Sequence, residues 1–202
     1  MLIAAWHNYR VKRVDLATGL LEDVAGTGES GYRGDGGPAL DATFDLPAGV
    51  VSDGADLLVA DQGNQVVRRV RSDGSMERVA GRCVVDECEA GREIVQCPGS
   101  DRGYCGDAAR CTAGCAPAFA GDGGDALEAR FAFGGGASAA PAGRIALAAD
   151  GSILVADTLN HRARRVDPSG TVTTVAGTGE RGTSGDGGPA TGARLDSPPT
   201  WP

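Results

Sequence analysis

The sequence LVADTLNHRARRV occupies residues 154–166, and a close copy, LVADQGNQVVRRV, occupies residues 58–70. A more divergent copy, IAAWHNYRVKRV, lies at residues 3–14. The asparagine that the copies share stands at positions 8, 64 and 160, so the intervals between copies are 56 and 96 residues. Self-similarity at a fixed period is the signature of a repeat protein. The chain is therefore predicted to contain about three related units with a basic period of 56 residues.

Two shorter phrases recur in register with this stretch. Val-Ala-Gly stands at 24–26, 79–81 and 175–177, and Gly-Asp-Gly-Gly stands at 34–37, 121–124 and 185–188. The longer interval arises from a cysteine-bearing insertion at 83–118 and a Gly/Ala-rich run at 134–141. The whole chain, 1–202, is thus interpreted as one repeat segment with units at about 1–46, 47–140 and 141–202. This register argues against disorder, which a low Leu/Ile/Val/Phe share beside a net charge of −8 would otherwise suggest.

Each unit divides into four short strands separated by turn residues. In the middle unit the strands are expected at 48–52, 56–60, 65–71 and 75–80, and in the third unit at 144–149, 152–156, 162–167 and 171–176. The first unit begins on its second strand, and its second to fourth strands are expected at about 2–23. The second strand is almost wholly apolar, which favours burial on both faces, whereas arginines in the third strand favour greater exposure.

Four antiparallel strands in each repeat are typical of a β-propeller blade. The predicted fold is all-β, with about three blades. Because closed rings contain roughly four to eight blades, we expect an incomplete ring, whose further blades come from a longer chain or from a homo-oligomer. The N-terminus has no signal-peptide pattern although the cysteines suggest export, which also favours a piece of a longer chain.

The overall composition excludes several classes of protein. A net charge of −8 and a pI near 4.7 argue against a nucleic-acid partner, because binding to phosphates requires positive charge. No apolar run approaches 18 residues, so membrane insertion is not expected. The arginine clusters at 68–71 and 164–165 are interpreted as solvated strand faces that carry salt bridges.

The repeats resemble the NHL family of β-propellers, in the bacterial branch that carries the phrase GDGGPA. The resemblance rests on VADTLNHRARRV at 155–166, TVAGTG at 174–179 and GDGGPA at 185–190, and it covers nearly the whole chain except the cysteine insertion. Ala5 and Asp125 depart from the pattern, since the other copies carry Asp and Pro at these positions. Some NHL-like propellers are zinc-dependent lyases that use several histidines, whereas this chain has only His7 and His161. The resemblance therefore implies a propeller without a catalytic site in this segment.

Two sets of polar residues recur with the repeats. The first combines an aspartate, an asparagine and an arginine, and it is predicted to shape the turn after the second strand, with Asn tolerating a left-handed φ and Arg pairing with Asp. These repeat-structural residues are Asp61, Asn64, Arg68, Asp157, Asn160 and Arg164. The second set, Asp35, Asp122 and Asp186 of the Gly-Asp-Gly-Gly loops, is expected to anchor connections between blades. A Ca²⁺ site at these aspartates is the alternative, although one carboxylate per loop supplies few of the six to eight oxygens that Ca²⁺ takes.

All six cysteines lie in the insertion at 83–118. They contain no Cys-x2-Cys pair and no nearby histidine, so zinc fits poorly and three disulfides are predicted. Fifteen pairings are possible, and the sequence does not choose among them. The cysteines are Cys83, Cys88, Cys97, Cys105, Cys111 and Cys115.

The sequence favours a non-catalytic extracellular or periplasmic scaffold that binds a protein, a glycan or a small ligand and carries no cofactor. Because only one unit carries the insertions, the contact surface is expected at 84–118 and 134–140. Two alternatives remain. One is a lyase or hydrolase whose active site uses blades outside this sequence, and the other is the sensor domain of a larger receptor.

Overall fold

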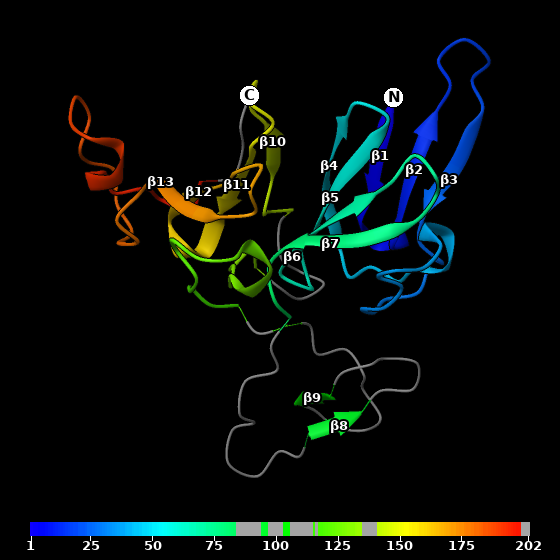
Figure 1. Cartoon of the computed structure of the whole chain (residues 1–202), viewed down its shortest axis with the longest axis horizontal. Helices are drawn as coiled ribbons and strands as arrows, with labels where there is room; N and C mark the ends of the chain where they lie inside the picture. The colour runs from blue at the N-terminus through cyan, green and yellow to red at the C-terminus, as the bar shows by residue number, and fades with distance from the viewer. Residues whose placement is uncertain (84–93, 97–102, 106–114, 116, 135–140, 199–202) are drawn as a thin grey trace.

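The computed structural model describes residues 1–83, 94–96, 103–105, 115, 117–134 and 141–198. Its strands form three antiparallel meanders, one in each predicted unit, and a separate two-stranded ribbon (Figure 1). The first sheet contains β1 (Leu2–Ala5), β2 (Arg10–Val14) and β3 (Leu21–Ala25). The second contains β4 (Pro47–Asp53), β5 (Asp56–Asp61), β6 (Val66–Val70) and β7 (Met76–Ala80). The third contains β10 (Ile145–Leu147), β11 (Ile153–Asp157), β12 (Arg162–Val166) and β13 (Val172–Ala176), and the ribbon pairs β8 (Ile94–Gln96) with β9 (Gly103–Cys105).

The predicted all-β fold with four-stranded blades is confirmed, and the strand bounds of the second and third units agree with the expected ones within two residues. The helical elements of the described residues are single 3₁₀ turns. They are η1 (Trp6–Asn8), η2 (Ala39–Asp41), η3 (Ala126–Glu128), η4 (Thr158–Asn160) and η5 (Ala190–Gly192). Among the described residues no helix has the length and apolar character needed to cross a membrane.

The turn between the second and third strands differs in one detail from the expectation. The left-handed residue is the one after the asparagine that the three copies share, namely Tyr9, Gln65 or His161, with φ of 52°, 55° and 52°. The asparagines do not take a positive φ, so that part of the prediction is wrong. Asn64 and Asn160 instead use their side-chain amides to donate hydrogen bonds to Asp61 and Asp157.

The three meanders carry a shift of register, or β-bulge, at the same place in β2, β6 and β12, which is the third strand of the repeat. The pairing register shifts between Val11 and Lys12, between Val67 and Arg68, and between Ala163 and Arg164. A bulge bends the strand and re-aims the side chain beside it. The third strand is consequently much less exposed than expected: Arg68 and Arg164 have no exposed surface. The interpretation of these two arginines as part of a solvated face is therefore wrong, whereas Arg69, Arg71 and Arg165 do form surface ion pairs.

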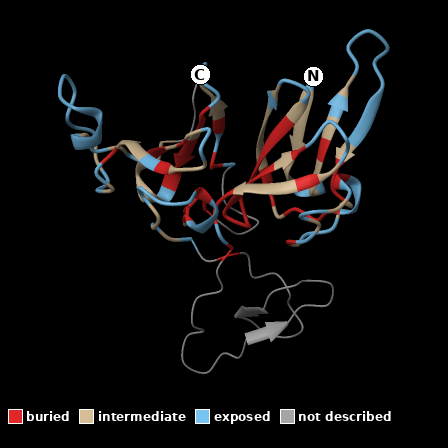
Figure 2. Cartoon of the chain, viewed as in Figure 1, coloured by how far each residue is buried: buried red, intermediate tan, exposed pale blue. Residues whose placement is uncertain are grey.

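The hydrophobic core lies between the sheets, and each connecting loop adds to it (Figure 2). Between the first and second sheets, Phe44 of the connection packs with residues such as Val11 and Val59. Between the second and third sheets, Phe131 takes the corresponding place beside Val67 and Val155. Each blade is thus stabilised mainly by its neighbours, as in other repeat proteins.

The glycine of the Val-Ala-Gly phrase permits a close approach between two backbones. Gly81 has a φ of +86°, and a Cβ atom there would lie 2.5 Å from the carbonyl oxygen of Gln65. A left-handed φ alone costs a non-glycine residue about 1–2 kcal/mol, and overpacking adds to this cost. The phrase therefore marks the point where the fourth strand leaves its blade.

Gly81→Ala is expected to lower the free energy of unfolding by about 2–3 kcal/mol, because it combines the φ penalty with the backbone clash. Gly74→Ala is the matched control, since Gly74 has a φ of +85° and nothing within 4 Å of the added Cβ. This control is expected to cost about 1 kcal/mol. Urea denaturation measures both, and equal losses would show that the close approach at Gly81 is unimportant.

Candidate functional site

The first connecting loop is joined to the second blade through a buried arginine. Nε of Arg68 donates to Oδ1 of Asp35 at 2.9 Å, and its Nη1 and Nη2 donate to the carbonyl oxygens of Thr43 at 2.7 Å and Arg33 at 2.8 Å. Nη1 also lies 3.4 Å from Oδ2 of Asp61, which belongs to the same blade as Arg68. The aspartate of the first Gly-Asp-Gly-Gly loop and the arginine of the next blade are therefore parts of one network.

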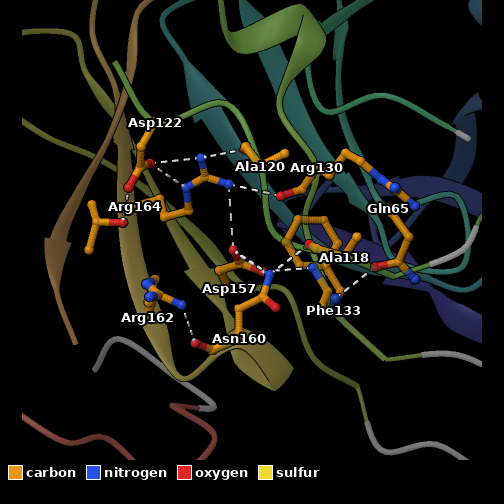
Figure 3. A network of polar contacts seen from close by, with 12 residues as sticks. Gln65, Ala118, Ala120, Asp122, Arg130, Phe133, Asp157, Asn160, Arg162 and Arg164 are labelled. Carbon is orange, nitrogen blue, oxygen red and sulfur yellow. Dashed lines mark hydrogen bonds and ion pairs between the residues drawn. The ribbon is translucent and has the colours of Figure 1, made fainter. Parts of the chain in front are cut away.

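The same network recurs between the second and third blades (Figure 3). Nε of Arg164 donates to Asp122 at 3.0 Å, and its Nη1 and Nη2 donate to the carbonyl oxygens of Arg130 and Ala120, each at 2.8 Å. Nη1 lies 3.6 Å from Oδ2 of Asp157. Because the donors of both guanidinium groups bind protein atoms, these residues hold blades together and are not arranged to act on a substrate.

Each buried guanidinium also lies between two aromatic rings. Arg68 is 5.3 Å from the ring centre of Tyr32 and 5.1 Å from that of Phe44. Arg164 lies 4.8 Å from Phe119 and 5.0 Å from Phe131. Such cation–π contacts favour a planar guanidinium over an ammonium group. The loop aspartate, the aromatic pair and the arginine thus form a matched set at both junctions.

Each loop aspartate also accepts a hydrogen bond from a hydroxyl group, which belongs to a different repeat position at each junction. Thr174 donates to Oδ2 of Asp122. At the first junction the corresponding strand position is Arg78, and the hydroxyl of Tyr32 bonds Asp35 instead. Burial and the charge of Asp35 raise the pKa of Tyr32, so this phenol stays protonated. The exchange of Thr for Arg makes the first junction chemically different from the second.

Burial dominates the titration of the two aspartates that follow the second strands. Asp61 is fully buried, and this desolvation raises its pKa to about 7, although Arg68, Asn64 and the N–H of Asp45 oppose the shift. Burial likewise raises the pKa of Asp157 to about 6. Both side chains therefore hold a proton more tightly in the folded state than in the unfolded chain.

We expect the free energy of unfolding to fall as the pH rises from about 4 to about 7. In this interval the folded state binds more protons than the unfolded state at Asp61 and Asp157, so stability declines with pH. Exposed aspartates with lowered pKa values, such as Asp150 and Asp167, act in the opposite sense below pH 4. Urea denaturation at pH 4.5 and 7.5 measures the trend. Asp61→Asn should flatten it, and a rise in stability between these pH values would contradict the assignment.

The third loop aspartate has no counterpart of this network. Asp186 is exposed, and a following blade that would present an arginine to it is not among the described residues. Among those residues no group of three or more His, Cys, Asp and Glu side chains is placed to hold a metal ion. Two of the three candidate Ca²⁺ ligands, Asp35 and Asp122, face a guanidinium group.

One of the predicted disulfides is present, and it closes the base of the insertion. Cys83 is bonded to Cys115, and both residues pack against Tyr32 and Val66 in a small buried cluster. The N–H of Cys115 donates to the carbonyl oxygen of Gly63 at 3.0 Å, so the base is fixed to the turn of the second blade. Cys88, Cys97 and Cys111 lie outside the described residues, as does the side chain of Cys105 in β9.

A pocket of about 430 Å³ opens beside the first junction. It is lined by residues 32–36 of the loop and by Glu77, Arg78 and Leu127. Its walls carry two carboxylates and two guanidinium groups, some already engaged: Glu77 pairs with Arg71 at 2.7 Å, and Nη1 of Arg78 donates to backbone carbonyls of Gly81 and Leu127. The pocket can therefore offer both donors and acceptors to a small polar molecule.

The sequence did not single out this pocket. Tyr32 lies in the first unit whereas Glu77 and Arg78 lie in the second, and only the fold brings them together. A signal existed, because Glu77 and Arg78 occupy the strand positions of Thr173 and Thr174 in the next unit. Most of the surface expected at 84–118 and 134–140 lies outside the described residues.

No family model and no curated protein matches the chain. Solved structures do resemble it. A structural genomics protein of unknown function from Bacteroides thetaiotaomicron aligns over 95% of this chain and 36% of its own, with a TM-score of 0.55 and 16% identity. An auxiliary nutrient binding protein from the same species aligns over 97% of this chain and 38% of its own, with a TM-score of 0.52 and 16% identity. The chain spans little more than a third of these structures, and the likeness shows the fold alone.

Proposed function

We propose that this chain is a non-catalytic NHL-type β-propeller scaffold that binds a small polar ligand, of the saccharide class, outside the cytoplasm. The observation that carries the proposal is the pocket at the first junction, which departs from the repeat pattern at Glu77 and Arg78. A feature that every blade repeats serves the scaffold, whereas a polar hollow whose lining departs from the repeat pattern is where a specific ligand can be recognised.

The chemistry of the lining supports a hydroxylated ligand over a strongly charged one. Arg33 and Arg78 provide donors, and Asp35 and Glu77 provide acceptors, so the pocket has no excess of charge of one sign. A sugar hydroxyl both donates and accepts, and it can therefore bond to both kinds of group. One structural neighbour is described as an auxiliary nutrient binding protein.

The disulfide supports the proposed location. Disulfides persist in extracellular and periplasmic compartments and are rare in the cytosol. Cys83 and Cys115 also share a buried cluster with Tyr32, which lines the pocket. The two disulfide-bonded cysteines themselves therefore lie next to a residue that lines the pocket.

Isothermal titration calorimetry with a panel of neutral mono- and oligosaccharides, amino acids and dipeptides tests the proposal. At least one saccharide is expected to bind, and Arg78→Ala is expected to weaken its affinity about tenfold, the effect of losing one hydrogen bond to a charged group. Arg165→Ala is the matched control, because this arginine pairs with Asp150 away from the pocket. Binding that Arg78→Ala leaves unchanged, or a panel without any saccharide ligand, would refute the assignment.

A further inference from the structure

The two carboxylates that line the pocket are already neutralised by cations outside it. Asp35 accepts a hydrogen bond from Nε of Arg68 at 2.9 Å and another from the hydroxyl of Tyr32. Glu77 lies 2.7 Å from Nη2 of Arg71. Neither Arg68 nor Arg71 belongs to the lining of the pocket. The formal charges of the lining cancel, but its two negative charges are balanced from behind.

The two arginines of the lining have no comparable partners. Nη1 of Arg78 donates to the carbonyl oxygens of Gly81 and Leu127, but no described residue places a carboxylate at ion-pair distance from Arg78 or an acceptor at its Nε or Nη2. Arg33 lies 3.8 Å from Glu29, and these side chains are 42% and 76% exposed. An exposed pair at this distance contributes little. The pocket therefore presents positive charge that a ligand can neutralise.

The first junction itself does not require an arginine at position 78. At the second junction the equivalent residue, Thr174, donates its hydroxyl to the loop aspartate, and Phe119 at the position of Tyr32 has no hydroxyl. At the first junction Tyr32 supplies that hydroxyl, which releases position 78 from this role. The first unit carries Asp23 at the same strand position. Arg78 is therefore the single cation among three equivalent positions.

The available edge of Arg78 is one that binds carboxylates elsewhere in this chain. Arg164 uses its Nε and Nη2 to bind Oδ1 of Asp122 at 3.0 and 2.8 Å. Two N–H groups of a guanidinium match a carboxylate in geometry as well as in charge. The bonds from Nη1 to two backbone carbonyls hold the Arg78 side chain in place, so less conformational entropy is lost when a ligand binds.

We propose that the pocket selects acidic saccharides, such as uronic acids, and that Nε and Nη2 of Arg78 bind the ligand's carboxylate. This inference rests on the saccharide site proposed above and specifies its ligand. The hydroxyl groups of the sugar bond to Arg33 and to the carboxylates of Asp35 and Glu77. A ligand with several negative charges fits less well, because these two carboxylates would repel it.

Calorimetric titration of the wild-type chain with matched sugars tests the proposal. The ligands are D-glucuronate and D-galacturonate, their methyl esters, and the neutral parents D-glucose and D-galactose. At least one acid is expected to bind about tenfold or more tightly than its own ester and its own parent, the effect of one hydrogen-bonded ion pair. The ester keeps the shape of the acid and removes only its charge. This comparison needs no variant, so it does not depend on how a substitution affects folding.

Variants of Arg78 assign the preference to this side chain. Arg78→Gln removes the charge, so acid and ester are expected to bind within about twofold of each other. Arg78→Lys keeps the charge without the fork of N–H groups and is expected to retain part of the preference. Arg82→Gln is the matched control, because Arg82 is exposed, pairs with Glu128 at 2.9 Å and does not line the pocket. This control should keep the full preference.

The outcomes separate the ligand class from the site itself. Equal affinity for acid, ester and parent, or tighter binding of the parent, would overturn the carboxylate assignment and leave the saccharide site standing. A preference that Arg78→Gln leaves unchanged would also overturn it. If no saccharide of either kind binds, the proposed function and this inference both fail.

Discussion

Arg68→Ala is expected to lower the free energy of unfolding by about 3–5 kcal/mol, the cost of breaking a buried ion pair by removing one partner. The substitution leaves the buried carboxylate of Asp61 without its cation and two backbone carbonyls without a donor. It also opens a space between Tyr32 and Phe44, which enclose the guanidinium. Because this network joins the first connecting loop to the second blade, its loss should reduce the cooperativity of unfolding as well.

One further variant separates charge from geometry at this position, and a second variant at another arginine is the control. Arg68→Lys keeps the positive charge but cannot reproduce the fork of hydrogen bonds, so it is expected to recover only part of the loss. Arg71→Ala is the control: this arginine is 45% exposed and pairs with Glu77, so the expected change is within about 1 kcal/mol. Urea denaturation followed by circular dichroism measures all three. A small effect of Arg68→Ala would show that water or side-chain rearrangement satisfies the network.

Replacing Cys83 and Cys115 by serine is expected to cost about 3–4 kcal/mol in the free energy of unfolding. The disulfide closes a loop with a sequence separation of 32 residues, and the chain-entropy model gives this magnitude for a loop of that length. The pair also packs against Tyr32 and Val66, so its loss exposes part of a buried cluster. Equilibrium denaturation of the oxidised protein and of the double variant measures the difference.

The matched comparison for the disulfide uses reduction. Adding a reductant to the wild-type protein should lower its stability by at least as much as the double substitution does, because reduction breaks Cys83–Cys115 and also acts on the two further disulfides that the sequence predicts. The double variant should also weaken saccharide binding, since Tyr32 lines the pocket. A double variant as stable as the wild type would mean that the insertion is already ordered by contacts such as that between Cys115 and Gly63.

Much of the fold could be predicted because the signals are local. The alternation and length of the apolar runs, and the Gly and Asp residues between them, placed β5 and β11 to within a residue. The position of the disulfide among fifteen possible pairings could not be predicted, since it depends on which cysteines the fold brings together. The pocket was missed for the same reason, because Tyr32 and Arg78 belong to different repeats of the chain.

The clearest difference concerns the arginines of the third strand. A sequence shows that Arg68 lies in a strand with Arg69 and Arg71, a pattern typical of an exposed face. The sequence does not show that a bulge changes the direction of the Arg68 side chain. It also does not show that Asp35, 33 residues earlier, accepts a hydrogen bond from Arg68. Because burying a charge is favourable only with a partner, the burial of Arg68 is a property of the pair and not of the strand.

The sequence by itself determined the repeat, the strands, the turns and the all-β architecture, since each depends on residues close together in the chain. Only the tertiary structure decided which polar residues are buried, which cysteines pair at the base of the insertion, and where a pocket opens. Those outcomes depend on contacts between neighbouring blades, as between Asp122 and Arg164, 42 residues apart. The periodicity of a single strand contains no information about its partner across the junction.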